Sequence, residues 1–438
     1  MKIALIHSHL NDRGGSQRYV IEIANNLKEL GVEVDVFCYE YNEKSCYLEL
    51  TEKLNIQKIY TREINSNKRK PGRKSNLFKG LLKKVYKIKV VEKLVSVLGV
   101  DYLYSLYSTN KLAKEISDLM LDSNNEYDLI FAHEEPLSVY AAIKYKKVKN
   151  IPIYWFCYDT IEKWFLEWEE KHKNSVLRKF LLQNIYFKYD KKIINKYIDK
   201  SAVLDNKMLE RYKRIYGNTP LIRRGGVPQN ILEYPRENIL RDKFDLSDDT
   251  IIIFSLTRFL SYRRVHDIFD MFEKLDKNIQ EKVFVYLNSP ITDERYYEWC
   301  MKNYKKTLEN KNIKINLNYP QNDTEMYGFY LSSDIFIFPN ENQTWGHAPL
   351  EAMACRVATL VSTGCGISEV MRNITSEGVF KVGDIDELSQ KVEDIIKNKT
   401  HIHISKNQKK YVAENLTWRK VCEVYIKDFK EILGDNNV

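Results

Sequence analysis

The feature that most constrains this chain is its opening order of strand, glycine loop, helix and strand. Lys2 to His7 is an apolar run typical of a buried strand, and the loop after it contains the pair Gly14 and Gly15. Ser16 is the expected N-cap of a helix, Gly31 stands where that helix should end, and Val32 to Cys38 predicts the next strand. This order is typical of a doubly wound α/β domain, although the loop is not a G-x-G-x-x-G dinucleotide fingerprint.

The same alternation continues along the chain and divides it in two. Helical segments separate the further predicted strands, which are Asp128–Ala132, Ile151–Cys157, Ser201–Leu204, Thr250–Leu256, Val283–Leu287, Ile313–Leu317, Asp334–Phe338 and Val357–Val361. We therefore expect one domain over residues 1–228, a second over 229–405, and C-terminal helices over 406–438. The 438 residues suffice for two such domains, whose ligands bind at the carboxyl ends of the strands.

The composition is globular and predicts no membrane span. Hydrophobic residues make up 44% of the chain and charged residues 29%, and no run approaches the ~18 uncharged apolar residues of a spanning helix. The apolar stretch at the start, Met1 to Ile6, is too short for a signal peptide. The seven cysteines are scattered without a C-x-x-C pair, which predicts free thiols in a reducing cytoplasm and no zinc site.

One segment, residues 62–98, differs in character. Lysines and arginines crowd residues 62–93, and apolar side chains from Leu77 to Leu94 recur at helical spacing. A basic amphipathic helix suits an anionic membrane surface, with which the net charge of +9 agrees. The alternative is a solvated insertion whose helix packs on the body of the domain.

The most specific segment runs from Phe338 to Cys355 and reads FPNENQTWGHAPLEAMAC. A strand ends, a polar loop turns at Gly346, and a helix begins near Pro349, because proline suits the first helical turn. The free N–H groups at such a helix start bind anions. Glu351, one turn into the helix, can accept two hydrogen bonds from a vicinal diol such as a ribose.

This segment resembles the retaining glycosyltransferases of family four, which have the GT-B fold of two Rossmann-like α/β domains facing across a cleft. That family carries two glutamates with seven residues between them; the second holds the nucleotide ribose and the first contacts the donor sugar. Glu351 matches the second glutamate, but Gln343 stands at the first position, so the identity of the donor sugar is left open. The resemblance implies that the donor-binding residues are Gln343, Gly346, His347, Ala348, Pro349, Leu350 and Glu351.

The resemblance also assigns cations to the donor diphosphate. The family has an arginine and a lysine early in its second domain, and Arg258 matches the arginine. The lysine position falls on Arg263 or Arg264, and either guanidinium would keep the charge and pair bidentately with phosphate.

The first half carries the remaining features of the family. Gly14 and Gly15 resemble the loop that lets the backbone approach the donor phosphate, and Gln17 is expected to meet the acceptor. His133 matches a histidine at the end of a strand, next to the donor sugar. Thr417 to Val421 resembles the helix that crosses back to brace the first domain.

Two apparent metal motifs have simpler interpretations. Asp384-Ile385-Asp386 resembles the Asp-x-Asp motif of the other glycosyltransferase fold, but it follows Gly383 and opens an amphipathic helix, so it is a predicted helix cap. His401 and His403 fall on a predicted loop with no cysteine or clustered acid nearby. We expect no metal.

The sequence thus predicts a cytoplasmic, metal-independent glycosyltransferase whose donor is a nucleotide-diphosphate sugar and which needs no cofactor. The resemblance implies retention of configuration, with the leaving phosphate taking the proton of the acceptor hydroxyl. The expected acceptor is a glycan or a polyprenol-linked glycan, reached at the inner face of the membrane. The alternatives are a sugar-nucleotide epimerase or phosphorylase on the same fold, or a non-catalytic basic protein that binds nucleic acid or membrane. Nucleic acid is not the expected partner, because it would not explain the segment from Gln343 to Glu351.

Overall fold

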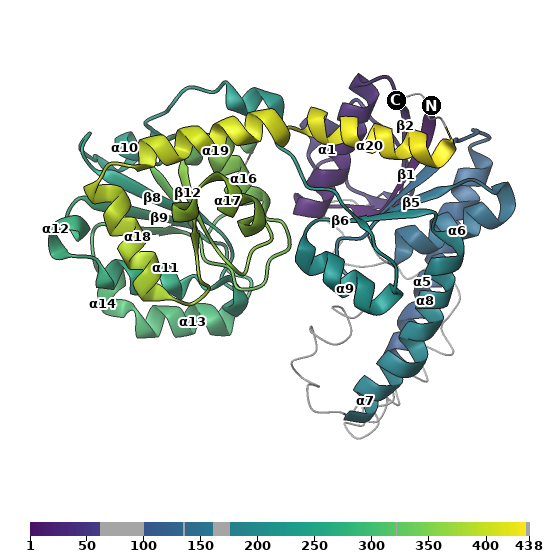
Figure 1. The fold of residues 1–438 in the computed structure, drawn as a ribbon, viewed down its shortest axis with the longest axis horizontal. Helices are drawn as coiled ribbons and strands as arrows, with labels where there is room; N and C mark the ends of the chain where they lie inside the picture. Colours follow the sequence, from purple (N-terminus) through teal and green to yellow (C-terminus); the bar gives the residue numbers. More distant parts are fainter. Residues whose placement is uncertain (62–99, 135, 161–175, 321, 435–438) are drawn as a thin grey trace. The chain divides into compact units, whose positions relative to one another are not determined.

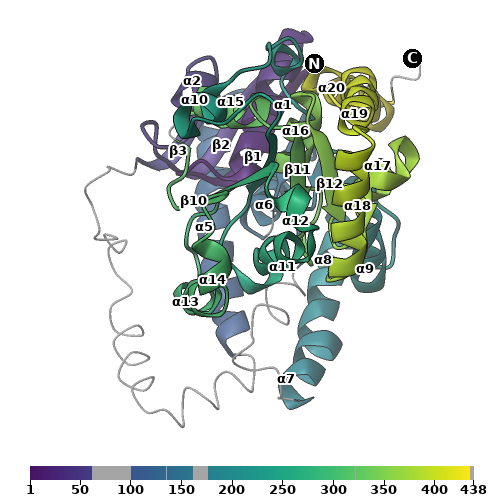
Figure 2. The same cartoon turned by 90° about the vertical axis from the view of Figure 1, so that its left-hand side faces the viewer.

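The computed structural model describes residues 1–61, 100–134, 136–160, 176–320 and 322–434 (Figure 1). The chain forms two compact units: unit 1 comprises Met1–Arg223 and Cys422–Val438, and unit 2 comprises Arg224–Val421. Each unit has one parallel sheet with helices packed against it, which confirms the α/β prediction (Figure 2). The basic insertion expected at 62–98 lies outside the described residues.

The sheet of unit 1 has seven strands in the order β3-β2-β1-β4-β5-β6-β7. These strands are β1 (Lys2–Leu10), β2 (Glu33–Tyr41), β3 (Asn55–Thr61), β4 (Leu129–His133), β5 (Ile153–Phe156), β6 (Lys200–Val203) and β7 (Leu221–Ile222). Strand β1 pairs in parallel with both β2 and β4, so the strand order reverses there. Ligands of open α/β sheets bind at such a switch point, outside the carboxyl ends of the strands.

The helices of unit 1 surround this sheet. They are α1 (Gly15–Glu29), α2 (Leu48–Thr51), α5 (Val100–Asp122), α6 (Leu137–Lys149), α7 (Val176–Leu181), the π-helical turn η3 (Leu182–Tyr186), α8 (Phe187–Tyr197), α9 (Asn206–Tyr216) and most of α20 (Trp418–Leu433). The apolar faces of α5 and α6 and the strands form one core, in which Ile116, Ile130 and Trp155 are fully buried.

The sheet of unit 2 has six strands in the order β10-β9-β8-β11-β12-β13, and the order reverses between β8 and β11. These strands are β8 (Ile251–Leu256), β9 (Val283–Asn288), β10 (Ile313–Asn316), β11 (Ile335–Phe338), β12 (Ala358–Ser362) and β13 (Val379–Phe380). Each agrees in place with a predicted strand except β13, which has only two residues and no sequence pattern of its own.

The helices of unit 2 pack against its sheet and form the second hydrophobic core with it. They are η4 (Gln229–Leu232), α10 (Ile239–Phe244), η5 (Ser261–Arg263), α11 (His266–Lys274), α12 (Lys277–Gln280), α13 (Glu294–Asn303), α14 (Lys305–Leu308), α15 (Asp323–Leu331), α16 (His347–Ala354), α17 (Ser368–Ile374), η6 (Ser376–Gly378), α18 (Ile385–Lys397) and α19 (His401–Asn415). Helices η4 and α10 lie in the polar stretch 229–249, at the start of the expected second domain.

The two C-terminal helices belong to different units. Helix α19 packs in unit 2, where the Gln408 side chain bonds both backbone groups of Thr359 on β12, each at 2.9 Å. Helix α20 begins in unit 2, and its residues from Cys422 onward belong to unit 1. There Asp428 accepts two hydrogen bonds from Arg223, both at 2.6 Å, and one from Tyr154 at 2.9 Å.

Local details correct some sequence expectations and confirm others. Helix α1 begins at Gly15 with Gly14 as its N-cap, so Ser16 lies inside the helix and is not the cap. His401 and His403 lie on α19 rather than in a loop. Asp384 is the N-cap of α18 and accepts a hydrogen bond from the Glu387 N–H, as predicted.

Two further expectations concern cysteines and membrane spans. All seven cysteines are buried and none forms a disulfide. Within the described ranges, no helix combines the length and the apolar character needed to cross a membrane.

Candidate functional site

In unit 2 the loop between β11 and α16 carries the predicted donor residues. Helix α16 starts at His347, and its N-cap Gly346 has φ +101°, a backbone conformation that disfavours any residue with a Cβ. Pro349 lies in the first turn, as predicted, and a Cβ on Gly346 would approach its Cγ to 3.2 Å. No side chain caps this helix. A helix start without a side-chain cap is suited to bind an anion.

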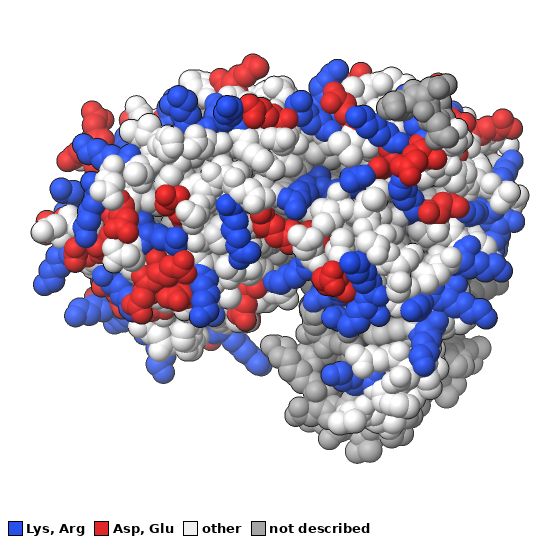
Figure 3. Space-filling model, viewed as in Figure 1, with Lys and Arg blue, Asp and Glu red and all other residues white. Residues whose placement is uncertain are grey.

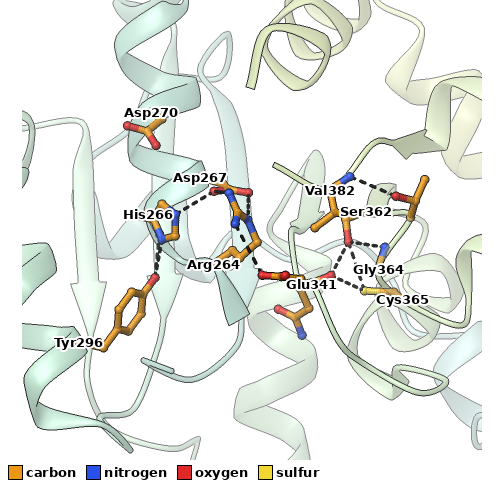
Figure 4. A network of polar contacts seen from close by, with 12 residues as sticks. Arg264, His266, Asp267, Asp270, Tyr296, Glu341, Ser362, Gly364, Cys365 and Val382 are labelled. Atoms are coloured by element: carbon orange, nitrogen blue, oxygen red, sulfur yellow. Dashed lines mark hydrogen bonds and ion pairs between the residues drawn. The ribbon is translucent and has the colours of Figure 1, made fainter. Parts of the chain in front are cut away.

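A second loop, from Ser362 to Ile367, holds the first in place (Figure 4). The N–H of Gln343 donates to the Gly364 carbonyl at 3.2 Å, and the Gln343 carbonyl accepts from the Gly366 N–H at 3.0 Å. A Cβ on Gly364 would lie 2.3 Å from the carbonyl oxygen of Glu341, so only glycine allows this approach. The backbone of Gln343 is therefore fixed, while its side chain is half-buried.

Glu351 sits on the buried side of α16, with only 6% of its surface exposed. Its carboxylate accepts a hydrogen bond from the Tyr330 hydroxyl at 3.4 Å, a long and therefore weak contact. Burial of the Tyr330 hydroxyl raises its pKa well above the usual value, and the negative charge of Glu351 raises it further. A buried carboxylate one turn from the helix start is suited to accept hydrogen bonds from a diol.

The three predicted cations follow β8, and their partners differ. Arg258 is exposed and stacks over the Tyr319 ring at 5.6 Å. Arg263 is packed against the fully buried Asn340, whose amide, with its oxygen toward the guanidinium, accepts from Nη1 at 2.7 Å. In the described part of the chain no carboxylate forms an ion pair with Arg258 or Arg263, and Nε of Arg263 has no hydrogen-bond partner.

Arg264 is bound differently. Its Nε and Nη2 donate to the two oxygens of Asp267 at 2.8 and 2.9 Å, and Nη1 lies 3.7 Å from Glu341 (Figure 4).

Burial lowers the pKa of Arg263, and the nearby charge of Arg258 lowers it further. The carboxylates instead raise the pKa of Arg264 against the effect of burial. The sequence left open whether Arg263 or Arg264 takes the position of the family's lysine. Their surroundings favour Arg263 as the candidate anion-binding residue.

In unit 1 the glycine loop lies at the carboxyl end of β1. Gln17 is 4% exposed, and its amide contacts Nε2 of His9 at 3.2 Å and the Ser16 hydroxyl at 3.0 Å. The Gln17 side chain folds over Gly14, whose Cβ position it would occupy. Gly15 has open space at its Cβ position. A side chain at position 14 would displace the Gln17 amide, whereas one at position 15 would meet no atom within 4 Å.

His133 ends β4, the neighbour of β1, so it lies at the same sheet edge as the glycine loop. It is fully buried, its ring stacks on Phe156 at 5.2 Å, and Nδ1 is 3.2 Å from the Tyr158 hydroxyl. Nε2 has no partner among the described residues. Burial holds the pKa of His133 well below its usual value, so the imidazole is neutral at pH 7.

The sequence did not single out a polar group beside this histidine. Glu134 has φ +76°, in the left-handed region that is strained for a side-chain-bearing residue. Its carboxylate accepts a hydrogen bond from Ser8 and lies 3.6 Å from Nε2 of the fully buried His7. The sequence shows that Glu134 follows a predicted strand. Only the fold shows that its carboxylate lies beside Ser8 and His7 of β1.

One group in the described ranges has the spacing of metal ligands. It consists of His266, Asp267 and Asp270, whose ligand atoms lie within 4.8 Å of one another. Asp267 is already paired with Arg264, and a metal ion there would face that guanidinium. The arrangement does not favour a metal site.

The comparisons with known proteins cover both halves. Residues 236–414 match the family described as "Glycosyl transferases group 1", and residues 13–195 match "Glycosyltransferase Family 4". N-acetyl-alpha-D-glucosaminyl L-malate synthase of Bacillus anthracis is 22% identical over 199 residues, which are 45% of this chain and 50% of that protein. The capsular polysaccharide biosynthesis glycosyltransferase CapM of Staphylococcus aureus is 22% identical over 204 residues, 45% of this chain and 52% of that protein. The matched stretch is thus about half the length of each relative.

Solved structures resemble the chain over nearly its whole length. Anabaena Alr3699/HepE in complex with UDP and glucose has a TM-score of 0.68 at 13% identity, covering 98% of this chain and 100% of that one. WaaG, a glycosyltransferase involved in lipopolysaccharide biosynthesis, has a TM-score of 0.61 at 14% identity, covering 99% and 100%. These likenesses identify the GT-B fold. With both halves matched by glycosyltransferase families and the fold agreeing throughout, this chain belongs to the family-four glycosyltransferases.

Proposed function

We propose that this enzyme transfers a sugar from a nucleotide-diphosphate sugar to a glycan or lipid-linked glycan, with retention of configuration and without a metal or cofactor. Unit 2 binds the donor: Arg263 and Arg258 meet the diphosphate, Glu351 the ribose and Gln343 the sugar. In unit 1 the proposed functional groups are the glycine loop and His133. The UDP and glucose in the HepE complex agree with this class of donor.

The observation that carries this proposal is Arg263, whose Nε is buried without a hydrogen-bond partner and whose guanidinium pairs with no carboxylate in the described part of the chain. Burying an unpaired charge is costly, so such a site is stable when an anion completes it. Arg258 adds a second positive charge nearby, as its effect on the pKa of Arg263 shows. Two cations beside the loop that leads into helix α16 suit a diphosphate.

The chemistry follows from this charge. As the bond from the sugar carbon to the diphosphate oxygen breaks, negative charge grows on the phosphate, and the two guanidiniums stabilise it. The departing phosphate oxygen takes the proton of the acceptor hydroxyl on the same face of the sugar. The protein then needs no separate base, and its main task is to hold donor and acceptor in line. His133, neutral at pH 7, can donate or accept a hydrogen bond to a sugar hydroxyl.

The acceptor and the location are inferred from charge and from relatives. WaaG acts in lipopolysaccharide biosynthesis and CapM in capsular polysaccharide biosynthesis. A glycan on a lipid carrier at the inner face of the membrane would suit a basic enzyme, here with net charge +9. The basic segment 62–98 is the sequence's candidate for this contact and lies outside the described residues.

A screen of nucleotide sugars tests the donor. The protein is heated with UDP-, GDP-, CDP- and dTDP-sugars, and the donor that stabilises it is then incubated with simple glycosides while the nucleoside diphosphate is measured. The anomeric configuration of the product is read by NMR. An epimerase would instead return a converted nucleotide sugar, and a phosphorylase would require inorganic phosphate. No stabilisation by any nucleotide would overturn the proposed function.

A further inference from the structure

The helices α7, η3 and α8 of unit 1 leave a row of large apolar side chains in solvent. Val176 is 84% exposed, Phe180 57%, Ile185 51% and Tyr189 57%. These residues are spaced by four, five and four positions. The five-residue step spans the π-helical turn η3, whose i→i+5 bonding includes one residue more than an α-helical turn. The row, which we call the α7–α8 stripe, therefore stays on one face.

The opposite face of the same helices is packed. Leu182 and Phe187 are buried in a small cluster with Tyr102 of α5. The Tyr102 and Tyr186 rings stack at 5.3 Å, so α5 lies beside η3 (Figures 1 and 2). Helix α5 also has an exposed large side chain, Tyr107, at 71%. One face of α7, η3 and α8 thus packs against the rest of unit 1, and the other face exposes apolar side chains to solvent.

The exposed charges carried by α7, η3 and α8 themselves have one sign. Between Val176 and Tyr197 the only acid is Asp190, which is 2% exposed and accepts hydrogen bonds from Tyr140 and Tyr216. The exposed charged residues of this stretch are all lysines: Lys179, Lys188, Lys192 and Lys196. In Figure 3 the coloured surface over α7 is white and blue.

A helix face whose exposed side chains are apolar or lysine is complementary to one kind of surface. An anionic bilayer takes up apolar side chains at its interface and attracts lysines to its headgroups. A second copy of this face would bring lysines against lysines, and a nucleic-acid backbone would leave the apolar stripe uncompensated. We propose that the α7–α8 stripe docks on an anionic lipid surface, with Phe180 and Ile185 inserted among the headgroups. Its use for a lipid-linked acceptor rests on the proposed function; lipid binding itself does not.

Vesicle flotation of the full chain tests this. The probes are phosphatidylcholine vesicles with and without phosphatidylglycerol. We expect binding to the anionic vesicles only, and we expect added salt to weaken it. The double variant Phe180→Ser/Ile185→Ser should reduce the partition by about tenfold or more. The double change Lys179→Gln/Lys188→Gln should also reduce it.

The matched control is Ile402→Ser/Lys410→Gln on α19 of unit 2, where Ile402 is 58% exposed and the Lys410 side chain 73%. It should bind like the wild type. The proposal is overturned if wild type fails to bind or binds both vesicles equally, if the stripe variant binds like wild type, or if the stripe variant instead abolishes a dimer or nucleic-acid binding. Stabilisation by UDP is measured on each variant. If the stripe variant keeps it, lipid binding has been separated from donor binding; if wild type itself lacks it, the donor proposal fails independently.

Discussion

The guanidinium of Arg264 donates from Nε and Nη2 to the two carboxylate oxygens of Asp267, at 2.8 and 2.9 Å, and Asp267 is fully buried. The neighbouring Arg263 contacts the amide of Asn340 and lies over the Tyr262 ring, and it pairs with no carboxylate of the described residues. We therefore expect different roles for the two adjacent arginines: Arg264 neutralises a buried carboxylate of the fold, and Arg263 meets a ligand. This difference separates effects on stability from effects on donor binding.

Replacement of Arg263 should weaken donor binding. The expected contact is a charge-assisted hydrogen bond to phosphate, typically ~1.5–3 kcal/mol, so Arg263→Ala should lower the affinity for UDP roughly ten- to a hundredfold. Calorimetric titration with UDP measures this. The melting temperature should change little, because removing a cation without a carboxylate partner leaves no acid unpaired. Unchanged UDP affinity would contradict the assignment.

Replacement of Arg264 should act mainly on stability. Arg264→Ala leaves Asp267 buried without its cation, at a cost of ~3 kcal/mol. For a unit of this size the melting temperature should fall by roughly 5–10 °C. The double variant Arg264→Ala/Asp267→Asn serves as the control, since it removes both charges and should recover part of the loss. A stable Arg264→Ala protein with weakened UDP binding would reverse the two roles.

Glu351 should recognise the ribose and not the phosphates. Glu351→Gln keeps the shape but removes the charge, and should weaken UDP binding about tenfold while leaving inorganic pyrophosphate binding unchanged. Tyr330→Phe, which removes the 3.4 Å hydrogen bond to Glu351, should have a much smaller effect. Equal losses for UDP and pyrophosphate in Glu351→Gln would show that the carboxylate acts on the loop as a whole.

These assignments show what the sequence contains and what it lacks. The loop and helix from Gln343 to Glu351 were predictable, because local turn and helix signals follow one another there in order. The choice between Arg263 and Arg264 was not, since it depends on which guanidinium packs beside Asn340. The approach of Gly364 to the Glu341 carbonyl joins segments after two different strands. The sequence of α5 contains no motif that would have assigned its place. Its buried residues pack against strands from elsewhere in the chain, so its position depends on the fold.

Gln343 should influence the choice of donor sugar. Its backbone is held by Gly364 and Gly366, so Gln343→Glu changes only a side chain that is half-buried. A carboxylate binds sugar hydroxyls more strongly than an amide does, so the ratio of rates with different nucleotide sugars should shift. Asn342→Asp adds the same charge at an exposed neighbour and is the control. Identical donor profiles for wild type and Gln343→Glu would show that this position does not touch the sugar.

Activity should survive removal of metal ions. Arg258 and Arg263 would supply the positive charge that a divalent cation supplies in other transferases, and Asp267 of the one metal-like group in the described ranges is already paired with Arg264. We expect EDTA to leave turnover within about twofold. Complete loss of activity that Mn²⁺ or Mg²⁺ restores would contradict metal independence.

Acid should destabilise unit 1 through its buried histidines. Burial lowers the pKa of His7 and of His133 below the 6.5 of an exposed histidine. Below pH 6.5 the unfolded chain therefore binds protons that the folded chain does not, and stability present at pH 7 is lost as the pH falls. Each histidine contributes up to ~1.4 kcal/mol per pH unit within this window.

The melting temperature measured from pH 7.5 down to about pH 5.5 should fall less steeply in His7→Gln than in wild type. His403→Gln, at an exposed position on α19, is the control for loss of any histidine. An equal slope in wild type and His7→Gln would mean that His7 takes up its proton in the folded chain, with Glu134, 3.6 Å away, as its partner.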